Sequence, residues 1–332
     1  DLLQRRAPGP LRGGSLHVGN PDQPARRRDG RFHRARIRHS IFTLGLDRLT
    51  GGRLLRSHLA KPLAVRSFDV SMPGWPAEWD GLRVGHFSDL HYGDLMPLDR
   101  GLDVIDRLGA LGPDLVAFTG DMVDLDCDGA EPLFERMTAL GAPLGALMVI
   151  GNHDLLDDGD RVRGMARDAG VRLLDDETVA LDPQGLELAH VGASGGEGPT
   201  TPLVVAGIDW DGAVKGLARR VDRVVGENPS LLLAHNPKAF LAASRHHVPL
   251  TLAGHTHGGQ VATKARPGVN LAVAHRLSAG FYHRDASTLF VTVGTGSWFP
   301  LRVQCPAEIV LLTCRRGEDG VHETTADLAG GT

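Results

Sequence analysis

Cysteine is scarce in this sequence. The three cysteines, Cys127, Cys305 and Cys314, form no Cys-x-x-Cys pair, and their number is odd. A disulfide framework or a cysteine-based zinc site normally shows an even count or closely spaced pairs. Neither is indicated here, and we interpret the cysteines as reduced thiols.

Long apolar runs are also missing. The longest near the start, Ile41–Leu46, is far below the roughly 20 residues that span a bilayer. Arg5-Arg6 is a twin arginine, but no apolar stretch of the kind an export signal needs follows it. The sequence therefore predicts no transmembrane helix and no clear signal peptide. We expect a cytoplasmic protein that contacts a membrane at most peripherally.

Aromatic residues make up only 5% of the chain, whereas glycine is abundant, with 43 residues. Many glycines suit tight junctions between strands and loops better than a helical bundle. The apolar fraction of 42% is enough for a substantial core. Composition thus favours a globular fold with many strand-to-loop turns.

Charge is unevenly divided along the chain. Residues 1–66 carry a net charge of +11, and the remainder carries −15. We expect disorder over residues 1–33, which are rich in Arg, Gly and Pro. Apolar residues spaced among arginines over 34–60 fit two short amphipathic helices on a membrane surface, and the alternative is a helix docked on the domain or a loosely ordered lead-in. We divide the chain into a basic extension (1–66), a main domain (67–315) and a C-terminal tail (316–332).

Short apolar runs alternate with helix-length segments in the main domain. This alternation predicts an α/β fold. Later runs come with turns and fewer helices, which favours a second, partly antiparallel sheet. The predicted strands are 82–87, 115–118, 147–150, 231–234 and 250–253, with later strands at 172–174, 186–191, 203–208, 288–293 and 308–312. The predicted helices are 98–111, 131–140, 161–169, 214–225 and 239–246.

Polar side chains follow five of these strands at the point where each strand ends. In open α/β sheets, ligands bind in the crevice beyond the carboxyl ends of the strands. Glycine directly before several of these side chains lets the backbone approach an ion closely. The strands therefore deliver seven candidate metal ligands to one edge: Asp89, His91, Asp121, Asn152, His235, His255 and His257.

The number and chemistry of these ligands predict two divalent metal ions. Seven ligands exceed the four of a closed zinc site. In hydrolytic two-metal centres the cations lie about 3.5–4 Å apart, and a carboxylate commonly bridges them. Carboxylate, imidazole and amide ligands without thiolate favour Mn, Fe or Zn over Ca or Mg. The sequence does not choose among those three.

Each motif alone is weakly specific, but their joint occurrence in this order is a strong signal. Asp89-Leu-His91, Gly120-Asp121, Gly151-Asn152-His153-Asp154, His235 and Gly254-His255-Thr-His257 together resemble the signature of the calcineurin-like metallophosphoesterase superfamily, over about residues 82–312. The resemblance implies a four-layer α/β/β/α sandwich, with two mixed sheets flanked by helices. It also implies one metal on Asp89, His91 and His257, a second on Asn152, His235 and His255, and Asp121 bridging both.

Two further segments refine the resemblance. The run His255-Thr-His257-Gly-Gly-Gln260 and the closing segment 294–308 resemble a bacterial branch of phosphodiesterases whose members are often membrane-associated or exported. That branch includes relatives that cleave the pyrophosphate of UDP-diacylglucosamine. Protein serine/threonine phosphatases instead have an Arg after the Gly-Asp pair and a Glu at the position of Asp154. Both departures argue against a phosphoprotein substrate.

His153 and Asp124 are the candidate catalytic residues. His153 follows the candidate ligand Asn152, so we expect its imidazole at the rim, where it would protonate the leaving alkoxide. Asp124 either holds that imidazolium, as in the similar His–Asp pair of the family, or is a surface acid in an acidic loop. Arg302 would contact phosphate or be an ordinary surface side chain. Trp298 and Phe299 would line a pocket or pack under the second sheet.

These observations predict a metal-dependent phosphoesterase, specifically a phosphodiesterase or pyrophosphatase acting on a small-molecule or lipid-linked phosphate. Hydroxide activated between the two metals would attack the phosphorus. The alternatives are a phosphomonoesterase or nuclease of the same superfamily and a catalytically silent binding scaffold. An acidic body without a basic track argues against nucleic acid, and the complete ligand set argues against a scaffold. The basic extension suits nucleic acid and, equally, peripheral contact with anionic lipid, and the oligomeric state is left open.

Overall fold

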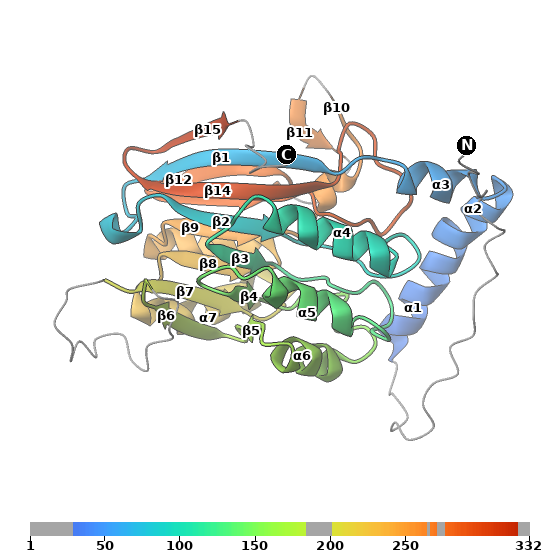
Figure 1. Ribbon diagram of the computed structural model, residues 1–332, viewed down its shortest axis with the longest axis horizontal. Helices are drawn as coiled ribbons and strands as arrows, with labels where there is room; N and C mark the ends of the chain where they lie inside the picture. The colour runs from blue at the N-terminus through green and yellow to red at the C-terminus, as the bar shows by residue number, and fades with distance from the viewer. Residues whose placement is uncertain (1–28, 184–200, 264–265, 271–275, 325–332) are drawn as a thin grey trace, which may run out of the picture.

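Two mixed β-sheets lie face to face at the centre of the protein (Figure 1). The computed structural model describes residues 29–183, 201–263, 266–270 and 276–324. The first sheet has the order β15-β1-β14-β2-β3-β4-β5, and the second has the order β12-β13-β9-β8-β7-β6. The strands of the first sheet are β1 (Ala64–Met72), β2 (Leu82–Phe87), β3 (Leu115–Phe118), β4 (Ala146–Met148), β5 (Arg172–Leu173), β14 (Glu308–Arg316) and β15 (Gly320–Thr324). Those of the second are β6 (Glu177–Leu181), β7 (Leu203–Ile208), β8 (Leu231–Ala234), β9 (Leu250–Ala253), β12 (Gly280–Arg284) and β13 (Ser287–Val291).

Parallel pairing dominates the middle of both sheets. Strands β2 to β5 are parallel to one another, as are β7, β8, β9 and β13. Strand β1 is parallel to β14, which pairs antiparallel with β2, and the antiparallel strands β6, β12 and β15 form sheet edges. Parallel strands buried on both faces consist of unbroken apolar runs, such as Leu115–Phe118 and Leu231–Ala234. Their carboxyl ends therefore point the same way, which sets up a common edge for a site.

A core to which both sheets contribute lies between them. Strand β1 contributes Phe68, Val70 and Met72, which alternate along the strand and all face inward. Leu115 of β3 and Leu233 of β8 belong to the same buried cluster, so both sheets contribute to it. This cluster fixes the distance between the sheets and hence the relative position of the loops at their ends.

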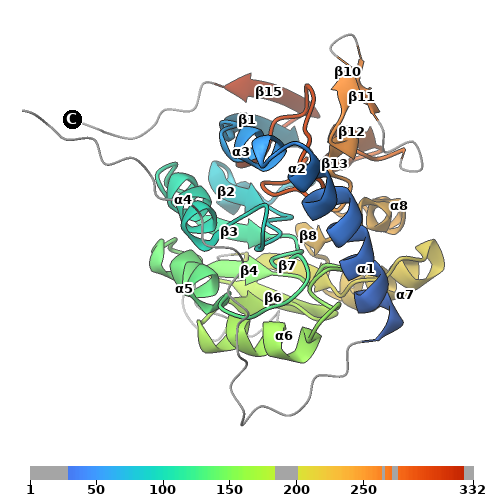
Figure 2. The ribbon, with the colours of Figure 1, turned by 90° about the vertical axis from the view of Figure 1, so that its right-hand side faces the viewer.

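Helices cover the outer face of each sheet (Figure 2). The first sheet packs against α4 (Leu98–Gly109), α5 (Glu131–Ala139) and α6 (Gly159–Asp168), and the second against α7 (Val214–Val224) and the short α8 (Phe240–Ala243). Helix α4 buries Val104, Ile105 and Leu108 at helical spacing against the first sheet and α5. The expected α/β fold, a four-layer α/β/β/α sandwich, is confirmed.

Most predicted elements are observed within one or two residues of their expected ends. The segment 239–246 is an exception, because only Phe240–Ala243 is α-helical and tight 3₁₀ turns flank it. Strands β1, β6, β12 and β15 of the two sheets were not predicted, nor was a separate antiparallel pair, β10 (Ala262–Thr263) and β11 (Arg266–Asn270). Strand β1 begins at Ala64, before residue 67, and β15 lies in the segment expected as a tail. The predicted strand 186–191 lies outside the described residues.

Helices also form in the basic N-terminal segment. They are α1 (Gly30–His39), a π-helical stretch (Ser40–Gly45), α2 (Leu46–Leu49) and α3 (Arg53–Leu59), and they lie beyond one end of the sheets (Figure 1). Helix α1 begins at Gly30, inside the segment expected to be disordered, because the Asp29 side chain accepts hydrogen bonds from the amides of Arg31 and Phe32. It docks on the domain through Phe32, Ala35 and His39. Among the described residues, no helix is long and apolar enough to cross a membrane.

Candidate metal centre

The seven predicted ligands gather at the carboxyl ends of five strands, and both sheets contribute. Asp89 and His91 follow β2, Asp121 follows β3, and Asn152 follows β4. His235 follows β8, while His255 and His257 follow β9. The residues that follow the predicted strands therefore come together at one place in the fold. They come from strands of two sheets, whereas the sequence predicted a single sheet edge.

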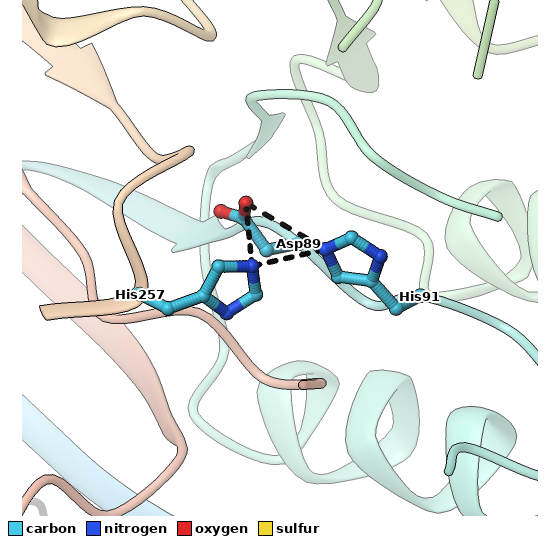
Figure 3. A group of neighbouring side chains, drawn as sticks. All are labelled: Asp89, His91 and His257. Atoms are coloured by element: carbon cyan, nitrogen blue, oxygen red, sulfur yellow. Dashed lines mark hydrogen bonds and ion pairs between the residues drawn. The ribbon is translucent and has the colours of Figure 1, made fainter. Parts of the chain in front are cut away.

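Asp89, His91 and His257 form the first candidate group (Figure 3). Their ligand atoms all lie within 4.8 Å of one another, and all three side chains are buried. The Nε2 atoms of His91 and His257 are 3.0 Å apart, and His257 Nε2 is 3.4 Å from Asp89 Oδ1. Two imidazoles and a carboxylate that converge in this way could hold a divalent cation.

Asp121, His235 and His255 form the second candidate group. Asp121 Oδ2 lies 3.1 Å from His235 Nε2 and 3.7 Å from His91 Nε2 of the first group. The Asp121 carboxylate therefore lies between the two groups. The Nδ1 of His235 donates to the carbonyl of Thr119 at 2.7 Å, which leaves Nε2 free to face the cluster.

Asn152 supplies an oxygen that fits this cluster. Its Oδ1 is buried and has no hydrogen-bond partner among the described residues. A buried polar atom normally has a partner, so an unpartnered amide oxygen on the loop that packs against Asp121 is what a metal-binding site leaves in the protein alone. The oxygen and nitrogen donors present here thus fit the two cations that the sequence predicted.

Backbone strain is concentrated at these residues. Asp89, His91, Asp121, His255 and His257 all have positive φ angles, between 50° and 72°. Non-glycine residues rarely adopt this left-handed region, at a cost of about 1–2 kcal/mol each, and they do so mainly where function requires it. Five of the seven candidates therefore have a backbone conformation that the rest of the fold must impose.

Two glycines allow the loops to come this close. A Cβ atom on Gly151 would collide with the carboxylate and backbone of Asp121, and one on Gly254 would collide with Asp89 and Ser88. The glycine preceding a ligand in each motif is thus needed for close approach of a neighbouring loop. It is not needed for a positive φ angle at either position.

The Asp154 carboxylate organises the loop that carries Asp121. It is fully buried and accepts four backbone N–H groups, those of Asp121, Met122, Val123 and Gly151, at 2.7 to 3.2 Å. Asp121 Oδ1 in turn accepts the amide of His153 at 2.7 Å. Asp154, the last residue of the Gly-Asn-His-Asp motif, therefore holds the loops after β3 and β4 in a fixed position relative to each other.

Burying the charged carboxylates of Asp89 and Asp121 is energetically unfavourable unless positive charge lies nearby. Burial raises the pKa of Asp89, and the charge of Asp121 raises it further. Burial would also raise the pKa of Asp121, but the imidazoles of His235, His153 and His91 hold it below its usual range. Burial lowers the pKa of His235, but the charges of Asp121 and Asp89 raise it overall to about 9. The cluster thus concentrates negative charge that cations would neutralise.

The two predicted catalytic residues are paired. His153 Nδ1 lies 3.1 Å from Asp124 Oδ1 and 2.7 Å from the Asp124 carbonyl oxygen. Asp124 is buried, so the alternative of a surface acid is wrong. Burial lowers the pKa of His153, but the charges of Asp121 and Asp124 raise it to about 9. With Nδ1 facing Asp124, the Nε2 edge of the ring is the one that remains for a substrate.

Several residues near the centre have roles that the sequence did not reveal. Arg302 is buried, which contradicts a surface position; it donates to carbonyls of the closing segment and lies 3.3 Å from His257 Nδ1. The amide of Gln260 donates to the carbonyls of Phe299 and Leu301 at 2.7 Å. Trp298 is exposed on the surface, with the Arg38 guanidinium over its ring. Sequence spacing gave no signal for these contacts.

Trp210 could have been found from the sequence. It follows β7, and its ring packs beside His235 and His255, with centroid distances of 5.3 and 4.8 Å. The same reasoning that selected the other strand ends applies to it. His86, within β2, is fully buried and bonded to Thr119 Oγ1 at 2.9 Å, as expected for a core histidine.

A four-layer sandwich with clustered Asp, His and Asn side chains at its strand ends defines the class of metal-dependent hydrolases. The chain belongs to the calcineurin-like phosphoesterase family, whose model matches residues 82–274. This family uses a binuclear metal centre, and its members are hydrolases that act on phosphoric ester bonds.

Two curated relatives agree with this assignment. The chain is 30% identical over 248 residues to the uncharacterized metallophosphoesterase YkuE of Bacillus subtilis, covering 72% of this chain and 81% of that protein. It is 25% identical over 270 residues to a transmembrane protein with metallophosphoesterase domain from Danio rerio, covering 77% of this chain but only 58% of that protein. A solved dimetal phosphatase from Danio rerio is 12% identical, with a TM-score of 0.38 over 65% of this chain and 88% of that one.

Proposed function

We propose that this phosphoesterase is a two-metal phosphodiesterase or pyrophosphatase. The observation that carries the proposal is the position of Asp121. Its Oδ2 is within 4 Å of the Nε2 atoms of His235 and His91, which belong to two different candidate groups. A carboxylate placed in this way suits a bridge between two cations held about 3.5–4 Å apart.

In this proposal Asp89, His91 and His257 would hold one cation, Asn152, His235 and His255 would hold the other, and Asp121 would contribute to both. The donor set of oxygen and imidazole nitrogen suits Mn, Fe or Zn. When bound, the two cations supply Lewis acidity that lowers the pKa of water and neutralises the charge of phosphate oxygens.

The protein's own residues complete the reaction. His153, held at Nδ1 by Asp124, donates the proton that the leaving alkoxide requires, from Nε2. The carboxylate of Asp124 keeps the ring in that orientation and stabilises its protonated form. Hydrolysis in this scheme breaks the P–O bond to the leaving group in one displacement, with no covalent bond between phosphorus and the protein.

A buried arginine beside His257 supports a diester over a monoester. Arg302 donates to the carbonyls of Val293, Gly294 and Gly296 and so is engaged by the backbone. Protein phosphatases use an arginine clamp on a phosphate that carries two negative charges. A diester carries one charge per phosphate and needs less cationic neutralisation, which fits a site whose buried arginine is already occupied.

The test is hydrolysis by the Mn-reconstituted chain of bis(p-nitrophenyl) phosphate against p-nitrophenyl phosphate, with metal content measured on the same samples. We expect two metals per chain and faster hydrolysis of the diester. Asp121→Asn should lose metal and activity together, whereas His153→Ala should keep metal and lose turnover on a diester with a poor leaving group, such as the methyl phenyl diester of phosphate. Activity on the monoester alone would contradict the diesterase proposal. Two bound metals without hydrolysis of either compound would favour a binding scaffold.

We also propose that the N-terminal helices contact an anionic lipid surface. Ile37, Ile41 and Phe42 are exposed by 60, 56 and 52%, and exposed arginines such as Arg34 and Arg38 flank them on α1. Apolar side chains bordered by arginine are the chemistry of an interfacial helix. Cosedimentation with phosphatidylglycerol vesicles should be lost in Ile41→Asp. Equal binding to phosphatidylcholine vesicles would contradict the charge contribution.

A further inference from the structure

We propose that His39, at the end of α1, is a positioning residue of the catalytic pair. It fixes the carboxylate of Asp124, which in turn orients His153. The inference rests on the proposed function, in which His153 protonates the leaving group. It makes the N-terminal helix part of the active site, although α1 precedes the whole family-matched region at 82–274.

His39 differs from the other polar residues of its helix. Helix α1 carries five further Arg and His side chains, and these are exposed, whereas His39 is buried to 8% exposure. Its Nε2 lies 2.9 Å from Asp94 Oδ2, and its Nδ1 lies 3.3 Å from Asp124 Oδ2. Because each ring nitrogen faces a carboxylate, the doubly protonated ring serves both. Burial lowers the pKa of His39, but the two carboxylates raise it overall to about 9.

The two oxygens of Asp124 are divided between different partners. Oδ1 faces His153 Nδ1 at 3.1 Å and His91 Nδ1 at 3.4 Å, whereas Oδ2 faces His39. A carboxylate held at only one oxygen can rotate about its Cβ–Cγ bond, since that torsion has a broad energy profile. Contacts on both oxygens remove this freedom. His39 therefore keeps Oδ1 directed at the ring that donates the proton.

The contact geometry also sets the size of the effect. Without His39, His153 Nδ1 still has the Asp124 carbonyl oxygen at 2.7 Å, so the ring keeps one of its two partners. Loss of a whole general acid costs about 10²–10⁴-fold, and a loosened one should cost less, about tenfold. That loss should fall on kcat and only where the leaving group needs a proton. A nitrophenolate leaves without one.

A purely structural role for His39 makes a different prediction. If its contact with Asp94 served only to dock α1, any variant that weakens the docking would have the same effect. Phe32→Leu is the matched control, because Phe32 anchors α1 at 3% exposure and its side chain carries no polar atom. Asp94→Asn is a second control, because it removes one carboxylate partner of His39 and leaves the contact with Asp124.

The experiment compares His39→Leu, His39→Gln, Phe32→Leu and Asp94→Asn, each loaded with Mn. Substrates are bis(p-nitrophenyl) phosphate and the methyl phenyl diester of phosphate. We expect His39→Leu to lower kcat about tenfold on the methyl phenyl diester and less than about twofold on the nitrophenyl diester, with KM unchanged. His39→Gln keeps a donor and should recover part of the loss. Equal losses on both substrates, or in Phe32→Leu, would overturn the proposal.

A second readout needs neither metal nor activity. In ¹⁵N-histidine-labelled protein without metal, the Nδ1–H of His153 should give a slowly exchanging NMR signal because two Asp124 oxygens hold it. We expect that signal in wild type and Phe32→Leu, and faster exchange in His39→Leu. An unchanged signal in His39→Leu would refute the positioning role. An inactive wild-type chain would contradict the proposed function. The NMR exchange rate of the His153 Nδ1–H would still decide whether His39 positions Asp124.

Discussion

The substitution Asp154→Asn tests what holds the centre together, because it changes one oxygen into an amide nitrogen. Asp154 Oδ1 accepts the N–H groups of Met122 and Val123, and Oδ2 accepts those of Asp121 and Gly151. An asparagine keeps one acceptor oxygen and therefore one of these pairs. Its NH₂ group must face the other pair, donor against donor.

The structure gives the size of this effect. Two backbone N–H groups are left without an acceptor at a fully buried site, each at a cost of about 1–3 kcal/mol. The free energy of unfolding should therefore fall by roughly 2–6 kcal/mol. At about 2–4 °C per kcal/mol for a chain of this size, Tm should fall by roughly 10 °C. Because Asp121 lies on the affected loop, metal content and hydrolysis should fall as well.

Urea unfolding and thermal melts measure this change, with Asp158→Asn as the matched control. Asp158 is in the same segment and caps α6 by accepting the amide of Arg161 at 3.0 Å. Asparagine caps a helix as well as aspartate does, so this control should change stability by less than about 0.5 kcal/mol. An Asp154→Asn variant with wild-type stability and full metal content would refute the view that this carboxylate holds the loops.

Three other perturbations follow from the same geometry. Gly254→Ala should lower metal content and kcat by more than about tenfold, because the new Cβ would collide with Asp89. Gly226→Ala is the control and should be neutral, because Gly226 has open space around it. Equal activity of the two variants would contradict this prediction. Chelation should lower Tm, and adding Mn at about 100 times its Kd should restore about 2.7 kcal/mol; a melt insensitive to both would argue against bound cations. Because the pKa of His39 is raised to about 9 in the folded protein, its protonated ring should stabilise the fold fully below about pH 6.5, the pKa of an unfolded histidine. This stabilisation should be lost as the pH rises through 9. The stability difference between wild type and His39→Leu, measured from pH 6 to 10, should shrink toward high pH, and a difference that grows would refute the ion pairs.

The sequence predicted the elements that carry their own local signal. Strands such as Leu115–Phe118 are unbroken apolar runs, and α4 shows apolar residues at helical spacing. Strand β1 was missed although Phe68, Val70 and Met72 alternate. Its partner β14 is more than 230 residues away in the chain, so nothing local shows that the strand will be paired. The edge strand β15 has mostly exposed side chains and hence no apolar pattern.

The sequence by itself determined the candidate ligand set, because the chemistry of a metal centre resides in residue types that follow strand ends, and strand ends are visible as apolar runs. Only the tertiary structure decided how these residues are positioned relative to one another. It placed Asp121 between two groups that each contain residues from both sheets, buried Asp124 and Arg302, and brought His39 from the N-terminal helix to the candidate catalytic pair. Those contacts join residues far apart in the chain, and the packing of the two sheets and α1 sets their distances.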